Sequence, residues 1–267
     1  MLPLEGETIK KKPSIRFLLL TQQSNYMFHL LQNHFRTAIL PGVAGDHEVR
    51  MRCVKFKNAV MASLEAKFGR GLELTLVGMI GWLARLLELE QKKTDFRVDE
   101  DDPTALTVMT TPACDAVCAA LDDFMGTIKT CLDGDNLDDF LLEFGLRVHR
   151  LILEHMRKFV FTTLGGLLLT RDLTKYQNAV LRFGVDRGLH AKFEMLRELG
   201  NVFIVRPDNL KQVLTEGHLK ELDKSFVTQY LHQRVDYQSD NLVRNLEHKF
   251  KMEMAQLKER TAANLKL

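Results

Sequence analysis

The sequence has few of the residues on which disulfide scaffolds, β-hairpins and serine-based catalytic sites depend. Among 267 residues there are four cysteines and five serines, and no Asn-Gly pair is present. Four cysteines are too few for a disulfide scaffold, and without a secretory signal they are expected to be reduced cytosolic thiols. The most apolar stretches are too short to cross a membrane or are interrupted by charges. We therefore expect a soluble intracellular protein.

Proline and β-branched residues are also scarce, and their scarcity favours helices. No proline lies between Pro41 and Pro103, and a second gap runs from Pro112 to Pro207. Gaps of this length leave room for long helices, because proline is the residue that most reliably interrupts one. Leucine occurs 44 times, against 25 occurrences of valine and isoleucine together, which favours helix over strand. The predicted fold class is all-α.

One helix is predicted to be unusually long. Apolar residues from Val49 to Leu86 recur every three or four positions, close to the 3.6-residue helical period. A helix that begins at Asp46 or His47 and continues for roughly 45 residues would be about 65 Å long, which predicts an elongated molecule. Further helices are expected over residues 14–40, 113–132, 137–169, 174–183, 189–205, 208–215 and 219–257, with Asn136 as an N-cap.

Charge is nearly balanced over the whole chain but unevenly distributed along it. The net charge of +2 argues against a dedicated nucleic-acid binder, which needs a strongly basic face. Residues 1–94 carry a net +6, residues 95–143 a net −11 and the remainder a net +7. We place a domain boundary at the acidic segment. The prediction is an elongated rod of two consecutive helical bundles: residues 1–132, which contain the long helix, and a C-terminal bundle over residues 137–267.

Motifs for catalysis are not found. None of the serines lies in a Gly-x-Ser-x-Gly elbow. The sequence Gly69-Arg70-Gly71 lies inside a helical pattern and is not followed by Gly-Lys-Ser/Thr, so it does not form a phosphate loop. A pair of carboxylates for acid–base catalysis stays open, and a deep pocket with perturbed carboxylates or histidines would reveal it. We predict no enzyme activity and expect no catalytic, cofactor-binding or metal-binding residue and no cofactor.

Three groups of residues resemble metal sites, but their spacing does not fit. Residues 133–143 are rich in aspartate, yet the EF-hand ligand positions are not met, and helix capping is the preferred interpretation. Cys114 and Cys118 lie four residues apart without a second close pair, so buried apolar cysteines are favoured over zinc ligands. His149 and His155 flank Glu154 without the His-Glu-x-x-His spacing, and we expect surface or interface histidines.

A basic run follows in the same predicted helix, formed by Arg147, Arg150, Arg157 and Lys158. One interpretation is a contact with acidic lipid or an acidic partner. The favoured interpretation is a solvated helix face with Arg150 and Glu154 as an i,i+4 ion pair.

Several blocks of sequence resemble a known family. They are Glu90–Phe96 (EQKKTDF), Cys131–Asp138 (CLDGDNLD), Arg147–His155 (RVHRLILEH), Pro207–Val213 (PDNLKQV), Leu222–Lys224 (LDK) and Arg234–Tyr237 (RVDY), with weaker support in Gly165-Gly166. In this order and spacing they resemble the C-terminal part of exocyst complex component five, the Sec-ten subunit. The resemblance covers residues from about Lys57 to about Asn245.

The resemblance implies a protein-interaction scaffold in exocytosis that tethers secretory vesicles to the plasma membrane, with the helical-bundle rod typical of tethering complexes. It implies other exocyst subunits as partners, especially the Sec-fifteen subunit, and an Arf-family or Rab-family small GTPase as a further candidate. A cytoplasmic protein associated peripherally with secretory vesicles and plasma membrane is expected. No partner-binding residue can be singled out. The alternative is a peripheral membrane module that binds acidic phospholipids through basic helix faces.

The chain also departs from the family pattern. Family members are much longer, so the chain is expected to be a fragment, a truncated gene model or a short form that corresponds to their C-terminal portion. Residues 1–46 do not match clearly, and residues 247–267 extend beyond the usual end of the family.

Overall fold

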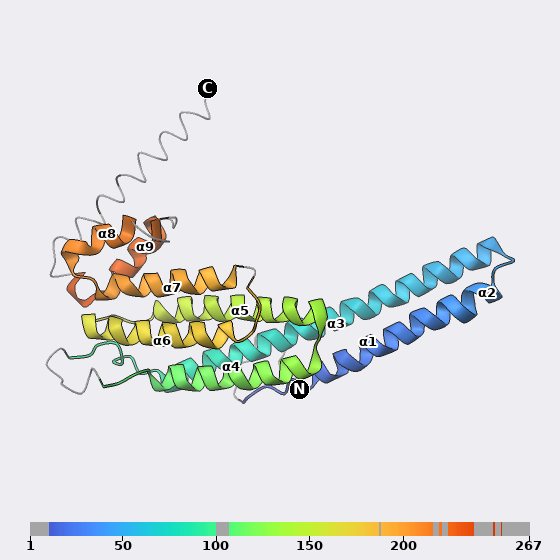
Figure 1. Ribbon diagram of the computed structural model, residues 1–267, viewed down its shortest axis with the longest axis horizontal. Helices are drawn as coiled ribbons and strands as arrows, with labels where there is room; N and C mark the ends of the chain where they lie inside the picture. Colours follow the sequence, from blue (N-terminus) through green and yellow to red (C-terminus); the bar gives the residue numbers. More distant parts are fainter. Residues whose placement is uncertain are drawn as a thin grey trace, which may run out of the picture. The chain divides into compact units, whose positions relative to one another are not determined.

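The protein is all-α in the residues that its computed structural model describes, which are 11–99, 107–186, 188–215, 219–220, 224–237, 248 and 252. The predicted fold class is confirmed. Within these residues the β-type pairing is a single isolated parallel bridge between Phe161 and Arg234. The elements, drawn in Figure 1, are α1 (Phe17–His34), the π-helix η1 (Phe35–Ile39), α2 (Leu40–Gly42), α3 (His47–Glu90), α4 (Pro112–Cys131), α5 (Gly134–Met156), α6 (Thr163–Leu181), α7 (Leu189–Ile204), the 3₁₀-helix η2 (Pro207–Asn209), α8 (Leu210–Thr215), α9 (Lys224–Leu231) and the 3₁₀-helix η4 (Val235–Tyr237).

The long helix is confirmed. Helix α3 has 44 residues, and the Oδ1 atom of Asp46 accepts a hydrogen bond from the Val49 backbone N–H at 3.0 Å, which is the N-capping arrangement. The ends of α4 and α7 lie within one residue of the predicted ranges, which are 113–132 and 189–205. The expected helix over residues 14–40 is present, but it passes into a π-helix at Phe35.

The prediction of one helix over residues 137–169 is wrong. Helix α5 ends at Met156 and α6 begins at Thr163, so that α6 also contains the separate short helix expected over residues 174–183. The Oγ1 atom of Thr162 caps α6 by accepting from the Gly165 N–H at 3.1 Å. The predicted N-cap at Asn136 is also wrong, because α5 begins two residues earlier at Gly134, which has a positive φ of 55°.

The last predicted helix, over residues 219–257, is wrong in its described part. Helix α9 ends at Leu231, and a 3₁₀-helix follows at Val235–Tyr237. Between them, the Gln233 side chain and the Arg234 side chain bond to carbonyls of other elements, so the chain leaves the helical path. The stripe predicted from Leu242 to Leu257 lies outside the described residues.

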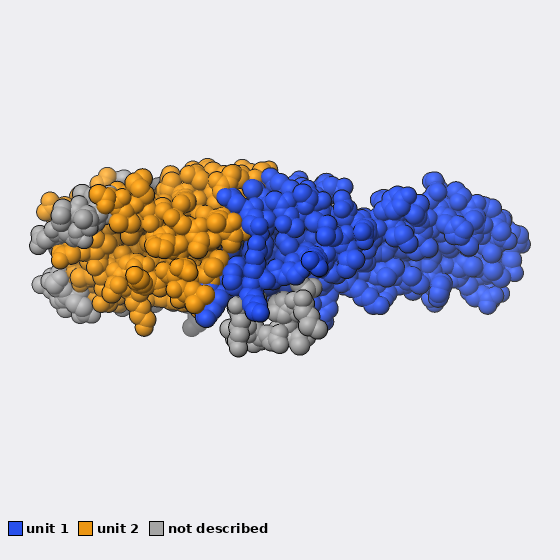
Figure 2. Space-filling model, turned by 90° about the horizontal axis from the view of Figure 1, so that it is seen from below, with its two compact units in different colours: residues 1–85, 122–144 blue, residues 86–121, 145–267 orange. Residues whose placement is uncertain are grey.

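Two compact units are present, and each is drawn from two stretches of the chain (Figure 2). Unit 1 comprises Met1–Arg85 and Asp122–Phe144, and unit 2 comprises Leu86–Leu121 and Gly145–Leu267. These bounds differ from those predicted for the two bundles, because α3, α4 and α5 each contribute residues to both units. The division into bundles over residues 1–132 and 137–267, and their arrangement as a rod, remain predictions.

Unit 1 contains a helical hairpin in which α1 and the first half of α3 run side by side and are joined through α2 (Figure 1). Aromatic contacts hold its base. The Phe68 ring packs against Phe17 with centroids 6.0 Å apart and against Phe28 at 5.6 Å. A Cβ atom on Gly71 would lie 2.1 Å from the Phe17 ring, so the absence of a side chain on Gly71 permits this contact.

Unit 2 contains α6, α7 and the part of α5 from Gly145 onward, and these helices lie side by side in Figure 1. Helices α6 and α7 form its main helix pair, and their backbones approach closely at two glycines. A Cβ atom on Gly166 would lie 2.8 Å from the Cβ of Phe203, and one on Gly200 would lie 3.1 Å from the Cδ1 of Leu173. Small residues at these positions let the two helices pack closely.

A third close approach fixes the start of α6. The Thr162 backbone N–H donates to the Phe96 carbonyl at 3.1 Å, and the Thr162 hydroxyl donates to the Val98 carbonyl at 3.0 Å. A Cβ atom on Gly165 would lie only 1.8 Å from the Phe96 carbonyl oxygen. Because that oxygen belongs to the backbone, it cannot move aside as a side chain can.

We predict that Gly165→Ala lowers the free energy of unfolding by about 3 kcal/mol, because the added methyl group forces the segment at Phe96 away from α6. The matched control is Gly69→Ala in α3, where a Cβ atom meets nothing within 4 Å. There the higher helix propensity of alanine should raise stability by roughly 0.5–1 kcal/mol. Urea unfolding followed by circular dichroism measures both changes, and equal effects at the two glycines would contradict the prediction.

Candidate functional site

A junction near the end of the described chain joins three helices of unit 2. We call it the Gln233–Arg234 junction and define it by Phe161, Phe203, Gln233, Arg234 and Asp236. Gln233 is buried, and its Nε2 atom donates to the Met156 carbonyl at 2.8 Å and to the Phe159 carbonyl at 2.9 Å. These carbonyls lie at the end of α5 and just beyond it, where no intrahelical donor is present.

The guanidinium of Arg234 satisfies the end of α7. It is buried, with 5% of its residue surface exposed, and its Nη1 atom donates to the carbonyls of Val202 and Val205. Its Nε and Nη2 atoms donate to the two carboxylate oxygens of Asp236, in a bidentate pair. Bidentate arginine–carboxylate pairs are among the stronger hydrogen-bonded contacts. A cation at the C-terminus of a helix also interacts favourably with the helix dipole.

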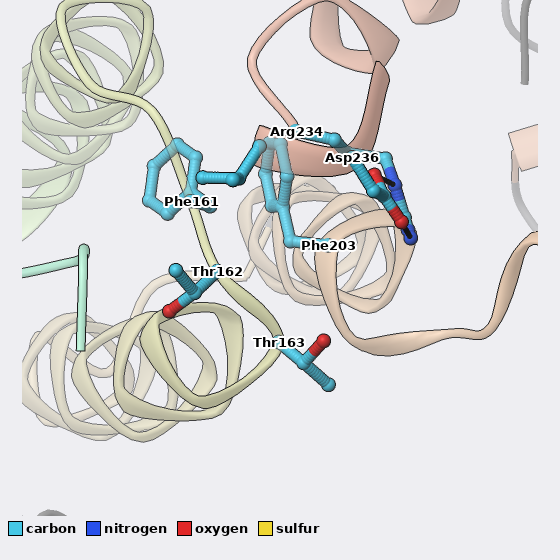
Figure 3. A pocket seen from close by; sticks show the side chains of 7 residues that line it. Phe161, Thr162, Thr163, Phe203, Arg234 and Asp236 are labelled. Atoms are coloured by element: carbon cyan, nitrogen blue, oxygen red, sulfur yellow. Dashed lines mark hydrogen bonds and ion pairs between the residues drawn. The ribbon is translucent and has the colours of Figure 1, made fainter. Parts of the chain in front are cut away.

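Backbone and aromatic contacts complete the junction. The Phe161 N–H donates to the Gln233 carbonyl at 2.7 Å, and the Val235 N–H donates to the Phe161 carbonyl at 3.0 Å. The rings of Phe161 and Phe203 are stacked, with centroids 4.2 Å apart, and Figure 3 shows them beside the Arg234–Asp236 pair. Phe161 also packs against Phe96, at 5.1 Å.

A small cavity of about 110 Å³ lies at this junction, lined by Phe161, Thr162, Thr163, Phe203, Arg234, Val235 and Asp236 (Figure 3). Its one arginine is already bonded to two carbonyls and a carboxylate. The hydroxyl of Thr162 is bonded to the Val98 carbonyl and to the Gly165 N–H. These bonds of Arg234 and Thr162 hold the helices together.

Stretches that carry the family resemblance meet in this part of unit 2. Phe96 ends the block EQKKTDF, Gly165 belongs to the Gly-Gly pair, and Arg234 and Asp236 belong to RVDY. Phe96 contacts both Phe161 and the start of α6. These blocks therefore have a structural role that their separation in the sequence does not reveal.

We predict that Arg234→Ala lowers the free energy of unfolding by about 3 kcal/mol, because it removes the guanidinium that donates to the Asp236 carboxylate and to two helix-terminal carbonyls. Arg234→Lys should recover little of the lost free energy of unfolding, since a single ammonium cannot reproduce the planar set of donors. The control is Arg206→Ala, which removes an exposed arginine of the same unit and should change stability by no more than about 0.5 kcal/mol. Thermal or urea unfolding tests both, and a tolerated Arg234→Ala would show that the junction is dispensable.

A second polar cluster is buried between α6 and the segment before α4. Asp172 is 2% exposed, and its Oδ1 and Oδ2 atoms accept from the backbone N–H of Thr111 at 2.9 Å and from its hydroxyl at 2.8 Å. Burial, reinforced by the nearby Asp115 carboxylate, raises the pKa of Asp172 to about 6, although the Thr111 hydrogen bonds act in the opposite direction. Asp115 itself pairs with Lys175 at 2.7 Å on the exposed side.

The raised pKa of Asp172 makes stability depend on pH. The folded protein keeps the Asp172 proton up to about pH 6, whereas the unfolded chain loses it near pH 3.8. The stabilisation that the folded protein gains from protonated Asp172 is thus fully present below pH 3.8 and is lost as the pH rises toward 6. We predict that Asp172→Asn, which stays neutral, gains roughly 2–3 kcal/mol relative to the parent between about pH 4 and pH 7. Urea unfolding at a series of pH values measures this difference, and a constant difference would contradict it.

Buried cysteines are confirmed at Cys114 and Cys118, whose residues are 0% and 5% exposed. A hydrogen bond with Cys118, together with burial, raises the pKa of the Cys114 thiol well above its ordinary range, so that the thiol stays protonated. All four cysteines of the chain are free.

The expectation of surface or interface histidines is wrong. His149 and His155 are 8% and 9% exposed, and they pack against the rings of Phe193 and Phe159. Burial, together with Lys192 near His149 and Lys158 near His155, lowers the pKa of each to about 4, so both are neutral near pH 7. In the basic run, Arg150, Arg157 and Lys158 are all exposed, and Arg157 also lies over the rings of Phe226 and Tyr230.

In the part of the chain that the structure describes, no three His, Cys, Asp or Glu side chains form a group that could hold a metal ion. No helix of the described residues is long and apolar enough to cross a membrane. The perturbed groups Asp172, His149 and His155 do not line the cavity at the junction. They also do not line the small cavity between α6 and α7 or the apolar groove of unit 1.

The sequence pattern did not predict the roles of Arg234 and Asp172. Arg234 was part of a family block but had no assigned role, because its partners lie about 30 residues away on α7. Asp172 was not singled out, although it follows the run Leu167-Leu168-Leu169 and shares a helix face with buried Leu168, Leu169 and Tyr176. A lone carboxylate on an apolar helix face was the signal that could have identified it.

Together, the helices and the hydrogen bonds of Arg234 and Asp172 define a helical-bundle protein. The family model "Exocyst complex component Sec10-like, alpha-helical bundle" matches residues 5–246. The chain belongs to this family of exocyst complex components, as the blocks of sequence predicted. The match includes most of residues 1–46, which the sequence analysis left unassigned. That earlier limit was wrong, because α1 is an apolar helix without a distinctive motif.

Curated relatives agree with the family assignment. The chain is 34% identical over 235 residues to "Exocyst complex component 5" of Homo sapiens, which covers 88% of this chain and 33% of the relative. It is 33% identical over 226 residues to the Drosophila melanogaster protein of the same name, and this match covers 84% of this chain and 31% of the relative. The "Exocyst complex component SEC10" of Saccharomyces cerevisiae is 28% identical over 238 residues, covering 89% and 27%. The chain thus spans about a third of the length of the relatives it matches.

Proposed function

We propose that this chain is a protein-interaction scaffold of the exocyst that helps to tether secretory vesicles to the plasma membrane in exocytosis. Its membership of the family carries the proposal, because the relatives are named as components of the exocyst complex. The all-α architecture supports it, since helical bundles supply long surfaces on which other subunits can pack.

We also propose that the role is non-catalytic. Two buried polar groups of unit 2 bond to the protein itself: Asp172 accepts from Thr111, and Arg234 donates to Asp236 and to the end of α7. A scaffold needs only stable surfaces, and these interactions provide stability. No cofactor is part of the proposal.

The proposed partners are other exocyst subunits, especially the Sec-fifteen subunit. An Arf-family or Rab-family small GTPase is a finer proposal of the same kind. The location that fits these partners is the cytoplasm, with peripheral association at secretory vesicles and the plasma membrane. We do not carry forward the alternative of an acidic-phospholipid module, because the relatives are named as subunits of a protein complex. Arg157, one of the arginines of the basic run, also lies over an aromatic ring.

We predict that the affinity-tagged chain, expressed in cells that contain the complex, co-purifies with other exocyst subunits and that the Sec-fifteen subunit is among them. Mass spectrometry of the purified material provides the measurement. Recovery of none of the subunits would refute the proposed function. A GTPase contact is checked by loading the GTPase with GDP or with a non-hydrolysable GTP analogue. The amount of GTPase that co-purifies with the chain is then compared between the two.

Two controls make the purification interpretable. The tag alone should recover no subunit. The variant Gly69→Ala, which removes no contact, should recover the same subunits as the parent chain. Co-sedimentation with anionic vesicles at low salt, where electrostatic attachment is strongest, tests the lipid alternative separately.

A further inference from the structure

The distal part of the unit 1 hairpin has no buried residue. From Gln22 to Val60, every residue is exposed or half-buried, although this stretch contains many apolar side chains. The buried residues of α1 are Leu18 and Thr21, both at its first turns. Two helices alone cannot bury apolar side chains on their outer faces, and an apolar face of this kind is normally covered by another element.

Helix α1 is apolar on its outer face as well as on its inner face. The inner face, with Phe17 and Phe28, packs against Phe68 of α3. The outer face carries a stripe of side chains that are 40–66% exposed: Leu19, Leu20, Tyr26, Met27, Leu30 and Leu31. Their spacing places them on about 140° of the helix surface, an arc that also contains the polar residues Gln23 and His34. The helix contains no Asp, Glu, Lys or Arg.

An apolar groove continues this stripe toward α3. It has a volume of about 250 Å³ and is lined by Leu31, His34, Phe35, Ile39, Cys53, Phe56, Lys57 and Val60. Leu31 belongs to both the stripe and the groove. Phe56 forms the opposite wall and is 73% exposed. A groove between two helices, lined by apolar side chains at helical spacing, has the shape that accepts a third helix.

The charge on the α3 side of the groove is of one sign. Arg52, Lys67 and Arg70 lie within about 40° of Phe56 around the helix axis, and all three are exposed. No Asp or Glu falls on this side between Val49 and Arg70, because Glu65 lies on the opposite side of the helix. A partner therefore meets an uncharged edge along α1 and a basic edge along α3.

We propose that this groove and stripe form a docking site for an amphipathic helix of another protein chain, with carboxylates along one edge of its apolar stripe. The apolar residues bury Phe56 and the stripe side chains that border the groove, Leu20, Met27 and Leu31, and the carboxylates face Arg52, Lys67 and Arg70. A second copy of this chain fits less well, since a symmetric pairing brings the same basic edge of both copies into one interface. The proposal relies only on the surface of unit 1 and goes beyond the exocyst assignment.

The test uses two labelled peptides of about 20 residues with the same Leu/Ile stripe, one flanked by glutamate and the other by lysine. We expect the glutamate peptide to bind the full chain at least about tenfold more tightly at low salt, with the preference reduced at high salt. Phe56→Ser should weaken this binding about tenfold. The triple variant Arg52→Glu, Lys67→Glu and Arg70→Glu should reverse the preference. Fluorescence anisotropy measures all of these affinities.

The substituted side chains are exposed, so the fold should be retained, and circular dichroism checks this for each variant. The matched control is Met109→Ser, which removes a side chain of similar exposure, 71%, from unit 2 and should leave binding unchanged. Equal binding of both peptides, binding of neither, or no effect of Phe56→Ser would overturn the proposal.

Two other results, each of which would assign the groove to a different occupant, would also overturn the proposal. A dimer of the parent chain that dissociates in Phe56→Ser, measured by analytical ultracentrifugation, would assign the groove to a second copy. Binding to phosphatidylcholine–phosphatidylserine vesicles that displaces the glutamate peptide and is lost in the same variants would assign it to a membrane. Neither outcome depends on whether exocyst subunits are recovered, so this proposal and the proposed function fail independently.

Discussion

The ends of two helices in unit 2 depend on side chains that arrive from far along the chain. A helix leaves its last carbonyls without internal donors, and burying them unpaired is costly. Gln233 satisfies carbonyls at the end of α5, and Arg234 satisfies those at the end of α7. Because the two residues are adjacent, one short segment fixes both helix ends. The stacked rings of Phe161 and Phe203 then pack beside a neutralised ion pair.

Local pattern predicted the fold class and the elements whose ends are decided locally. The 3.6-residue period predicted α3 because its apolar stripe is long and regular, and Asp46 caps it through its own neighbour Val49. The break between α5 and α6 was missed because Phe159 and Phe161 continue an apolar pattern there. The carbonyls of Met156 and Phe159 at this break accept from Gln233, more than 70 residues further on, and the local sequence pattern does not reveal that partner.

The candidate sites show the same division between local and distant causes. Burial of Cys114 and Cys118 was predicted because no second close pair in the sequence offers the further ligands that a zinc site needs. Burial of His149 was missed, because it depends on Phe193 from another helix, and a histidine beside arginines looks solvent-exposed in sequence. The blocks that carry the family resemblance identified the family without revealing that Phe96 and Phe161, from different stretches of the chain, are in contact.

The start of α6 has a consequence for the order in which unit 2 folds. Its first turn contains two adjacent glycines, which weaken a helix, and its capping residue Thr162 is bonded to the carbonyls of Phe96 and Val98. These partners are 64–66 residues apart in the chain, and closing a loop of that length has an entropic cost that precedes the contact. We therefore expect the middle of α6 to form before its N-terminal turn, which becomes stable when the distant segment docks.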